Sequence, residues 1–336
     1  MRTATFISAL FLTVALITTG IPGPAPAAEF NLKFQIYLPP ELAGPNQQMA
    51  ADIERMSNHR IKMTVLTAGE LVSSPDTLKA CKAGVIDVVA GSGYHYSELK
   101  SGAIQAGLPM TWQSGVEAEV LWEKMGFREL VAKSFEPYGV HYLGPMLLSP
   151  YAMTSKVPIR SLDDLRKIKL RAASSPAKMF KELGINSVYI KTEEMYLALS
   201  TGQVDGVLWG GATDYEAMKF QEVSPYYCSS YIVNPIVDSI FINKKTWNRM
   251  PDDLKAIVEQ AVHRCSWNYV AFSMDGEYKS QSTTYKDKVT TLPQEDIYKL
   301  TEAAQKVWEE EAQKDELNRQ MVEKIKVLLR SLGRLK

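Results

Sequence analysis

The chain has 336 residues and carries 38 Lys and Arg against 38 Asp and Glu, so its formal net charge is zero. This balance provides no basic surface excess for a nucleic acid or an anionic membrane, and we expect neither as a partner. A chain of this length exceeds what one hydrophobic core usually serves, which predicts two lobes of ordinary domain size.

The first residues have the pattern of a secretory signal peptide. Arg2 precedes an apolar run from about Ala4 to Leu16, and small residues follow around Ala25-Pro26-Ala27. We assign residues 1–28 to this signal peptide, which predicts a periplasmic mature protein. An uncleaved N-terminal anchor is the alternative. No later stretch has the length and apolarity of a spanning helix, so the mature chain is not expected to span the membrane.

The three cysteines, Cys81, Cys228 and Cys265, leave at least one thiol unpaired in an exported chain. Their spacing matches no metal motif, and we predict neither a metal nor another cofactor. Buried thiols are the favoured interpretation, and a single disulfide is the alternative.

The first half of the mature chain alternates strand and helix patterns. Period-two alternation predicts a strand at 31–38, and it is followed by patterns of a helix at 45–57, a strand at 60–66, a helix at 73–84 and a strand at 85–91. This order predicts an α/β fold with a parallel-type sheet covered by helices.

The same order resumes after a stretch containing Pro and Gly at 144–159, where we place the first crossing between lobes. Strands are predicted at 168–172, 186–190 and 204–209, separated by helices that end at Gly184 and Gly202. From Met250 to about Lys286 the pattern predicts one long helix that could brace both lobes, and residues 293–332 predict one or two further helices.

No catalytic constellation is visible in the sequence. The four histidines are scattered, and the chain has no HExxH, GxSxG, GxGxxG or P-loop motif. We therefore predict that the protein is not an enzyme. An exported enzyme that uses the same cleft between lobes is the alternative.

Arg171 is the best candidate for binding an anion. It ends a predicted strand, immediately before the loop AASSP that opens a helix, so its side chain is expected at the carboxyl edge of a sheet, where ligands of open α/β folds bind. Its planar fork can hold a carboxylate through two parallel hydrogen bonds, which a lysine cannot do. An exposed arginine at a strand end is the alternative.

Aromatic residues near strand ends are candidates for the walls of the site. Trp209 ends a predicted strand before Gly210, Tyr94 follows another strand, and Tyr151 lies in the presumed crossing. Trp112 is a weaker candidate for a ligand contact, and Asp238 is a candidate for a polar ligand group or for a hinge residue.

Several blocks of the sequence resemble the solute-binding subunits of tripartite ATP-independent periplasmic (TRAP) transporters. The strongest is SLDDLRKIKLRAASSPAKMFKELGINSVYIKTEEMYLALSTGQVDGVLW at 161–209, supported by AGVIDVVAG, GLPMTW and INKKTWNRMPDDLKAIVEQA at 242–261. The blocks are spread over most of the mature chain, and the resemblance is closer to the branch that binds 2-oxo acids. The joint occurrence of the blocks is specific, whereas none of them is specific alone.

The resemblance implies a two-lobed periplasmic-binding-protein fold with crossing strands and a long hinge-spanning helix. Lobe I would comprise residues 29–152 plus about 240–285 with the hinge helix, and lobe II residues 153–239 plus about 286–336 with the C-terminal helices. The resemblance also implies that the lobes close on the ligand by a hinge.

The resemblance further implies roles for individual residues. Arg171 stands at the position of the family's carboxylate-binding arginine, Trp209 and Gly210 stand in the ligand-facing segment of the second lobe, and Tyr94 and Tyr151 correspond to contacts from the first lobe and the crossing. Leu208 replaces the acidic residue that precedes this tryptophan in members that bind a metal with the ligand, so we expect Arg171 to contact the ligand directly.

The implied function is the capture of a small organic monocarboxylate, such as a 2-oxo, 2-hydroxy or aromatic acid. The implied partners are the membrane subunits of a TRAP transporter, driven by an ion gradient. A receptor that signals through a membrane sensor is the alternative.

Overall fold

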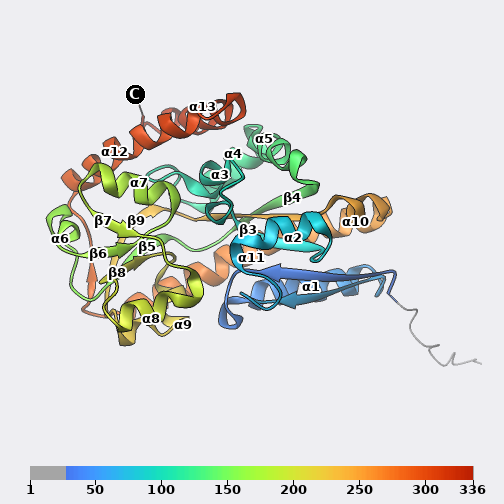
Figure 1. The fold of residues 1–336 in the computed structure, drawn as a ribbon, viewed down its shortest axis with the longest axis horizontal. Helices are drawn as coiled ribbons and strands as arrows, with labels where there is room; N and C mark the ends of the chain where they lie inside the picture. The colour runs from blue at the N-terminus through green and yellow to red at the C-terminus, as the bar shows by residue number, and fades with distance from the viewer. Residues whose placement is uncertain (1–27, 336) are drawn as a thin grey trace, which may run out of the picture.

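The computed structural model describes residues 28–335 and contains two β-sheets flanked by helices (Figure 1). The predicted signal peptide lies almost entirely outside the described residues. The two sheets define the two lobes of the expected α/β fold. In Figure 1 lobe I occupies the centre and right of the view, and lobe II occupies the left.

The sheet of lobe I has five strands in the order β2-β1-β3-β10-β4. Strands β1, β2 and β3 are mutually parallel, whereas β10 runs antiparallel to both β3 and β4. The sheet is therefore mixed and not purely parallel as expected, because β10 enters it from the other lobe. The bounds are β1 Phe30–Ile36, β2 Ile61–Leu66, β3 Val88–Ser92, β4 Val140–Leu147 and β10 Val237–Asn243.

The sheet of lobe II has six strands in the order β11-β9-β5-β8-β6-β7. Strand β6 is parallel to both β7 and β8, and β5 is antiparallel to β8 and β9 because it enters from lobe I. The bounds are β5 Tyr151–Ser155, β6 Lys169–Arg171, β7 Asn186–Val188, β8 Gly206–Leu208, β9 Tyr226–Val233 and β11 Val289–Thr290.

Two strand connections cross between the lobes side by side. Residues 148–150 join β4 to β5, and residues 234–236 join β9 to β10. The Leu148 amide donates to the Ile236 carbonyl at 2.9 Å, and the Ile236 amide donates to the Ser149 carbonyl at 2.9 Å. The two crossing segments therefore form a hydrogen-bonded two-stranded ribbon.

The long helix α11, Asp252–Ser282, is the third connection between the lobes. It contacts α1 and β4 in lobe I and α9 in lobe II, as the prediction of a bracing helix required. Near its C-terminal end, the buried Glu277 accepts hydrogen bonds from the Ala212 amide at 2.6 Å and from the Tyr231 hydroxyl at 3.1 Å, which attaches the helix to lobe II.

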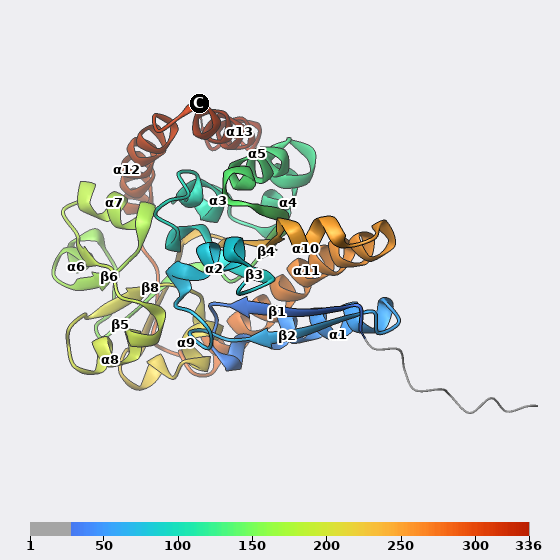
Figure 2. The same ribbon diagram turned by 45° about the vertical axis from the view of Figure 1, so that its right-hand side comes forward.

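The remaining helices cover the sheets, and α12 and α13 arch from one lobe to the other (Figures 1 and 2). Helix α12 packs against α7 of lobe II, but α13 packs against α3, α4 and α5 of lobe I. The C-terminal helices, expected in lobe II alone, thus span both lobes. The bounds are α1 Gly44–Met56, α2 Thr77–Ala83, α3 Gly102–Gly107, α4 Gly115–Lys124, α5 Phe127–Phe135, α6 Leu162–Arg166, α7 Ser174–Glu182, α8 Met195–Ser200, α9 Ala212–Ala217, α10 Lys244–Arg249, α12 Gln294–Ala312 and α13 Glu316–Ser331.

The three cysteines are free and buried, as the sequence favoured. Burial is the main reason that the pKa of each thiol is raised, so they behave as small apolar side chains. Among residues 28–335, no helix is long and apolar enough to cross a membrane.

Candidate ligand-binding site

Arg171 lies where the carboxyl ends of three parallel strands meet. Because β6 lies between β7 and β8, the segments that follow those two strands flank Arg171. Its Nε donates to the Ile190 carbonyl at 2.9 Å, and its Nη1 donates to the Leu208 carbonyl at 3.1 Å. These bonds orient the guanidinium at the edge of the lobe II sheet.

The charge of Arg171 has no counterion in the described part of the chain. The residue is 1% exposed, and no carboxylate of residues 28–335 lies within ion-pair distance of it. The ring of Tyr189 lies 5.4 Å from the guanidinium carbon and provides only a weak cation–π contact. A buried charge without a partner is costly, so this arrangement favours an anionic ligand.

Two adjoining cavities lie between the lobes next to Arg171. They share Tyr37, Trp209 and Ile236 as common walls. The first is lined by Tyr37, Ser92, Tyr94, His95, Tyr151, Arg171, Ala173, Trp209 and Ile236, and the second by Tyr37, Leu38, Leu148, Ser149, Trp209, Gly210, Asp214, Ile236 and Tyr269. Both lobes and both crossing segments therefore contribute to one site.

Tyr94 and Tyr151 form one wall of the first cavity. Their ring centroids are 6.0 Å apart, and the Tyr94 hydroxyl donates to the Gly107 carbonyl. Burial raises the pKa of both hydroxyls, and the nearby Arg171 guanidinium offsets part of this rise for Tyr151. Both side chains are thus neutral near pH 7. The Tyr94 proton is already donated to Gly107, so Tyr151 is the one of the two that can donate to a ligand.

Trp209 and Gly210 form the turn that separates the two cavities. The Tyr215 hydroxyl accepts hydrogen bonds from the Trp209 amide at 2.9 Å and from the Gly210 amide at 3.2 Å. A Cβ at Gly210 would lie 2.9 Å from both Cβ and Cγ of Asp214, closer than side-chain atoms approach in proteins. The turn therefore requires glycine so that the tryptophan can face the cleft.

Trp112 lies outside the site, contrary to the sequence-based prediction. It is fully buried, and its ring packs edge-on against Trp122 at 5.4 Å. Its Nε1 donates to the Pro235 carbonyl at 2.8 Å. The indole is thus a core residue that supports the second crossing segment. A large apolar ring that follows a turn can pack in the core or line a cleft. The motif GLPMTW does not show which of these two positions the tryptophan takes.

Asp238 lies next to the cavities without lining them. It is fully buried near the start of β10. Burial raises the pKa of this carboxyl to about 8, although the nearby Tyr37 and Ser92 hydroxyls favour the charged form.

Several lining residues were not predicted from the sequence. His95 directly follows the predicted Tyr94, and its ring packs edge-on against Tyr37 at 4.8 Å. Burial, together with the Arg171 charge, lowers the pKa of His95 to about 3, so the imidazole is neutral. Asp214 lines the second cavity, and burial raises the pKa of its carboxyl to about 6. Tyr37 lies near the end of the strand predicted at 31–38, a signal comparable to that of Tyr94, whereas Tyr269 lies within a long helix and gave no local signal.

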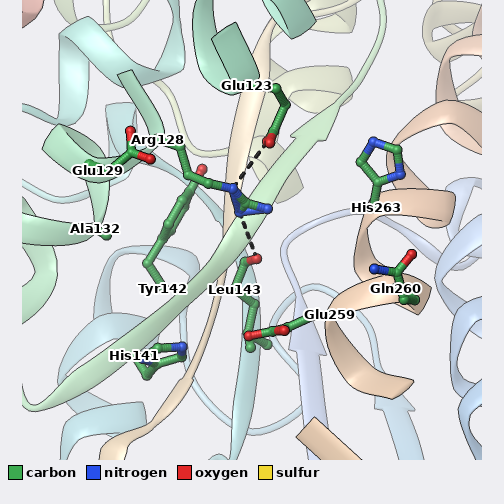
Figure 3. A pocket seen from close by; sticks show the side chains of 10 residues that line it. All are labelled: Glu123, Arg128, Glu129, Ala132, His141, Tyr142, Leu143, Glu259, Gln260 and His263. Carbon is green, nitrogen blue, oxygen red and sulfur yellow. Dashed lines mark hydrogen bonds and ion pairs between the residues drawn. The ribbon is translucent and has the colours of Figure 1, made fainter. Parts of the chain in front are cut away.

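A larger, more open hollow lies on lobe I between α5, β4 and α11 (Figure 3). Arg128 enters it, but its Nε is paired with Glu123 at 3.1 Å and its Nη1 donates to the Leu143 carbonyl at 3.0 Å. On the opposite wall, His263 lies 2.8 Å from Glu119. Because this arginine already has a carboxylate partner, the hollow lacks the uncompensated charge that distinguishes the site between the lobes.

No group of three or more His, Cys, Asp or Glu side chains among residues 28–335 is arranged to hold a metal ion. Leu208, which directly precedes Trp209, is buried and has no side-chain oxygen. Its backbone carbonyl accepts the hydrogen bond from Arg171.

The family model of DctP, bacterial extracellular solute-binding protein, family 7, matches residues 41–315. The chain belongs to this family of solute-binding proteins, and the resemblance drawn from the sequence is confirmed.

Two relatives are similar to this chain in sequence over most of their length. A monocarboxylate 2-oxoacid-binding periplasmic protein of Nostoc is 25% identical over 296 residues, which cover 85% of this chain and 80% of the relative. A sialic acid-binding periplasmic protein, SiaP of Vibrio cholerae, is 22% identical over 75% of this chain and 79% of its own.

Solved structures share the fold. A TRAP periplasmic solute-binding protein from Chromohalobacter salexigens with bound (S)-(+)-2-amino-1-propanol has a TM-score of 0.85 at 22% identity, covering 91% of this chain and 97% of its own. One from Colwellia psychrerythraea, with bound calcium and pyruvate, has a TM-score of 0.81 at 19% identity, covering 90% of this chain and 95% of its own. The predicted two-lobed α/β architecture is therefore confirmed.

Proposed function

We propose that this protein is a periplasmic receptor that captures a small organic monocarboxylate and delivers it to the membrane subunits of a TRAP transporter. The observation that carries the proposal is the buried guanidinium of Arg171, which has no carboxylate partner in the described chain and borders a cavity between the lobes. An anionic ligand would neutralise this charge and use the fork of the guanidinium.

The walls of the site favour a ligand with an apolar body. Tyrosine and tryptophan rings form much of the lining of the two cavities. Because Arg171 is the one lining residue with a fixed positive charge, a monocarboxylate fits better than a dicarboxylate. The Nostoc relative, named for its binding of 2-oxo monocarboxylates, supports the same substrate class.

We propose binding without turnover, with closure of the lobes as the event that the membrane subunits recognise. Arg171 and Trp209 belong to lobe II, Tyr94 belongs to lobe I, and Ile236 lies in a crossing segment, so a bound ligand would contact both moving parts. Export through cleavage near residue 28 would place the receptor on the periplasmic side of the membrane.

The test is ligand binding to residues 29–336, screened by thermal shift with monocarboxylates, dicarboxylates, amino acids and sugars, and then measured by calorimetry. A ligand at a concentration 100 times its Kd adds about 2.7 kcal/mol to the free energy of unfolding, which gives a clear shift. Arg171→Ala should weaken binding by about 2–5 kcal/mol because the carboxylate loses its partner. Arg166→Ala, which changes a partly exposed arginine of the same lobe, should leave binding unchanged.

Equal affinity in Arg171→Ala, or shifts confined to sugars, would contradict the carboxylate site. Genes for transporter membrane subunits next to this gene would support delivery to a transporter, whereas a sensor gene there would favour a signalling receptor.

A further inference from the structure

His95 brings an unpaired hydrogen-bonding atom to the wall of the first cavity. The residue lines this cavity together with Arg171, and its ring nitrogen Nδ1 is buried without a hydrogen-bond partner in the described chain. Leaving a buried polar atom unpaired costs free energy, and native proteins pair most such atoms. The cavity is the space from which a ligand could supply the missing partner.

The hydroxyl groups of the same wall differ from His95, because each already has a partner in the protein. These pairs are Tyr37 and Ser92 with Asp238, Tyr94 with Gly107, and Tyr151 with Arg171. Such bonds hold the wall in shape, whereas the imidazole keeps its hydrogen-bonding capacity for another molecule.

The position of His95 is fixed both by its backbone and by its ring. The residue ends the 3-10 turn Gly93–His95, which directly follows β3. A Cβ at Gly93 would lie 2.2 Å from the Gly102 carbonyl oxygen, so this turn is packed directly against the start of α3. The imidazole packs edge-on against Tyr37, with the ring centroids 4.8 Å apart. A group held in this way can select a ligand by the position of its polar atoms.

His95 and Arg171 line one cavity from different lobes. His95 follows a strand of the lobe I sheet, and Arg171 ends a strand of the lobe II sheet. Burial is the main reason that the pKa of His95 is lowered to about 3, so the imidazole is neutral and offers one N–H donor and one acceptor nitrogen. It therefore suits a neutral polar group better than a second carboxylate. A ligand with such a group would connect the two lobes.

We propose that His95 is a specificity-determining residue, whose Nδ1 forms a hydrogen bond with a hydroxyl or keto oxygen of the ligand while Arg171 holds the ligand's carboxylate. The inference rests on the proposed function and narrows its substrate class to hydroxy or oxo monocarboxylic acids. An unsubstituted acid would leave Nδ1 unpaired.

The experiment compares butyrate with its 2-hydroxy, 3-hydroxy, 2-oxo and 3-oxo derivatives, by calorimetry on residues 29–336. These acids share one carboxylate and one chain length, so differences in affinity report the added oxygen. At least one derivative should bind about ten to a hundredfold more tightly than butyrate.

Substitutions of His95 test whether this residue provides the preference. His95→Phe keeps an aromatic ring against Tyr37 but has no ring nitrogen, so it should bind the derivatives no more tightly than butyrate. His95→Asn and His95→Leu form a matched pair of similar size. The amide of the first can reach the position of Nδ1 and should retain part of the preference, whereas the second should abolish it. His59→Phe, at a side chain that is 57% exposed, should preserve the wild-type preference.

The kind of oxygen that is preferred identifies the role of Nδ1. A keto oxygen can only accept a hydrogen bond, so tight binding of an oxo acid requires that Nδ1 donates. A preference confined to hydroxy acids shows instead that Nδ1 accepts. Either result supports the proposal.

The outcomes separate this inference from the proposed function. If butyrate binds as tightly as every derivative, or if His95→Phe and His95→Leu keep the preference, the role of His95 is refuted and the carboxylate receptor stands. If none of these acids binds, the role of His95 is refuted and the thermal-shift screen decides the receptor function. If Arg171→Ala leaves the affinities unchanged, the carboxylate site itself is refuted.

Discussion

The amide of Leu148 donates to the carbonyl of Ile236 at 2.9 Å, and this bond joins the two segments that cross between the lobes. Both residues also line the cleft, Leu148 in the second cavity and Ile236 in both cavities. The segments that cross between the lobes therefore also form part of the cavity walls. A ligand that contacts Ile236 touches the part of the backbone about which the lobes would turn.

Gly210→Ala should destabilise the protein by about 1–3 kcal/mol, because the added methyl group would overlap the Asp214 side chain in a buried turn. The free energy of unfolding in urea measures the change. Gly44→Ala is the control, since a Cβ there meets nothing within 4 Å and the residue begins helix α1. Equal stability of the two variants would show that the turn can shift without cost.

Glu277→Ala should lower the free energy of unfolding by about 3 kcal/mol, because the Ala212 amide and the hydroxyls of Tyr227 and Tyr231 would lose a buried acceptor. Chemical denaturation measures this effect. Asp275→Ala, which removes an exposed carboxylate of the same helix, should change the stability by less than about 0.5 kcal/mol. A similar small change for Glu277→Ala would refute the role of this residue in attaching α11 to lobe II.

Asp238 should make the protein less stable as the pH rises from about 4 to about 8. Burial raises the pKa of this carboxyl to about 8 in the fold, so the native state keeps a proton that the unfolded chain has lost. Its stabilising contribution is present below pH 4 and declines through this window, by at most about 1.4 kcal/mol per pH unit. Asp238→Asn removes the titrating carboxyl and with it this pH dependence of stability. The Tm of the variant minus that of the wild type should therefore increase from pH 5 to pH 8. A constant difference would contradict a protonated Asp238.

His95 should act in the opposite direction at acid pH. Burial and the Arg171 charge lower the pKa of its imidazole to about 3, so between about pH 6.5 and pH 3 the unfolded chain binds a proton that the native state does not. Stability falls as the pH drops through this window. His95→Gln should lose less stability than the wild type between pH 7 and pH 5, in thermal unfolding without ligand. His59→Gln, at a side chain that is 57% exposed, should follow the wild type.

Local periodicity and turn residues were enough to predict most elements that surround Arg171. The predicted strands at 168–172, 186–190 and 204–209 appear as β6, β7 and β8, because each is a short apolar run bounded by Gly, Pro or Ser. The position of Arg171 at a strand end followed from the same pattern. The mixed direction of the sheets did not, since strand direction depends on which lobe the chain has just left.

Sequence by itself determined the α/β class, the long helix and the candidate arginine, because these depend on the spacing of residues near one another in the chain. Only the tertiary structure decided that Trp112 supports the core, that α13 returns to lobe I, and that Tyr37, His95 and Tyr269 surround one cleft. It also decided that Arg171 is buried without a counterion in the described chain. Burial and the absence of a counterion are properties of contacts between distant segments, and no local pattern encodes them.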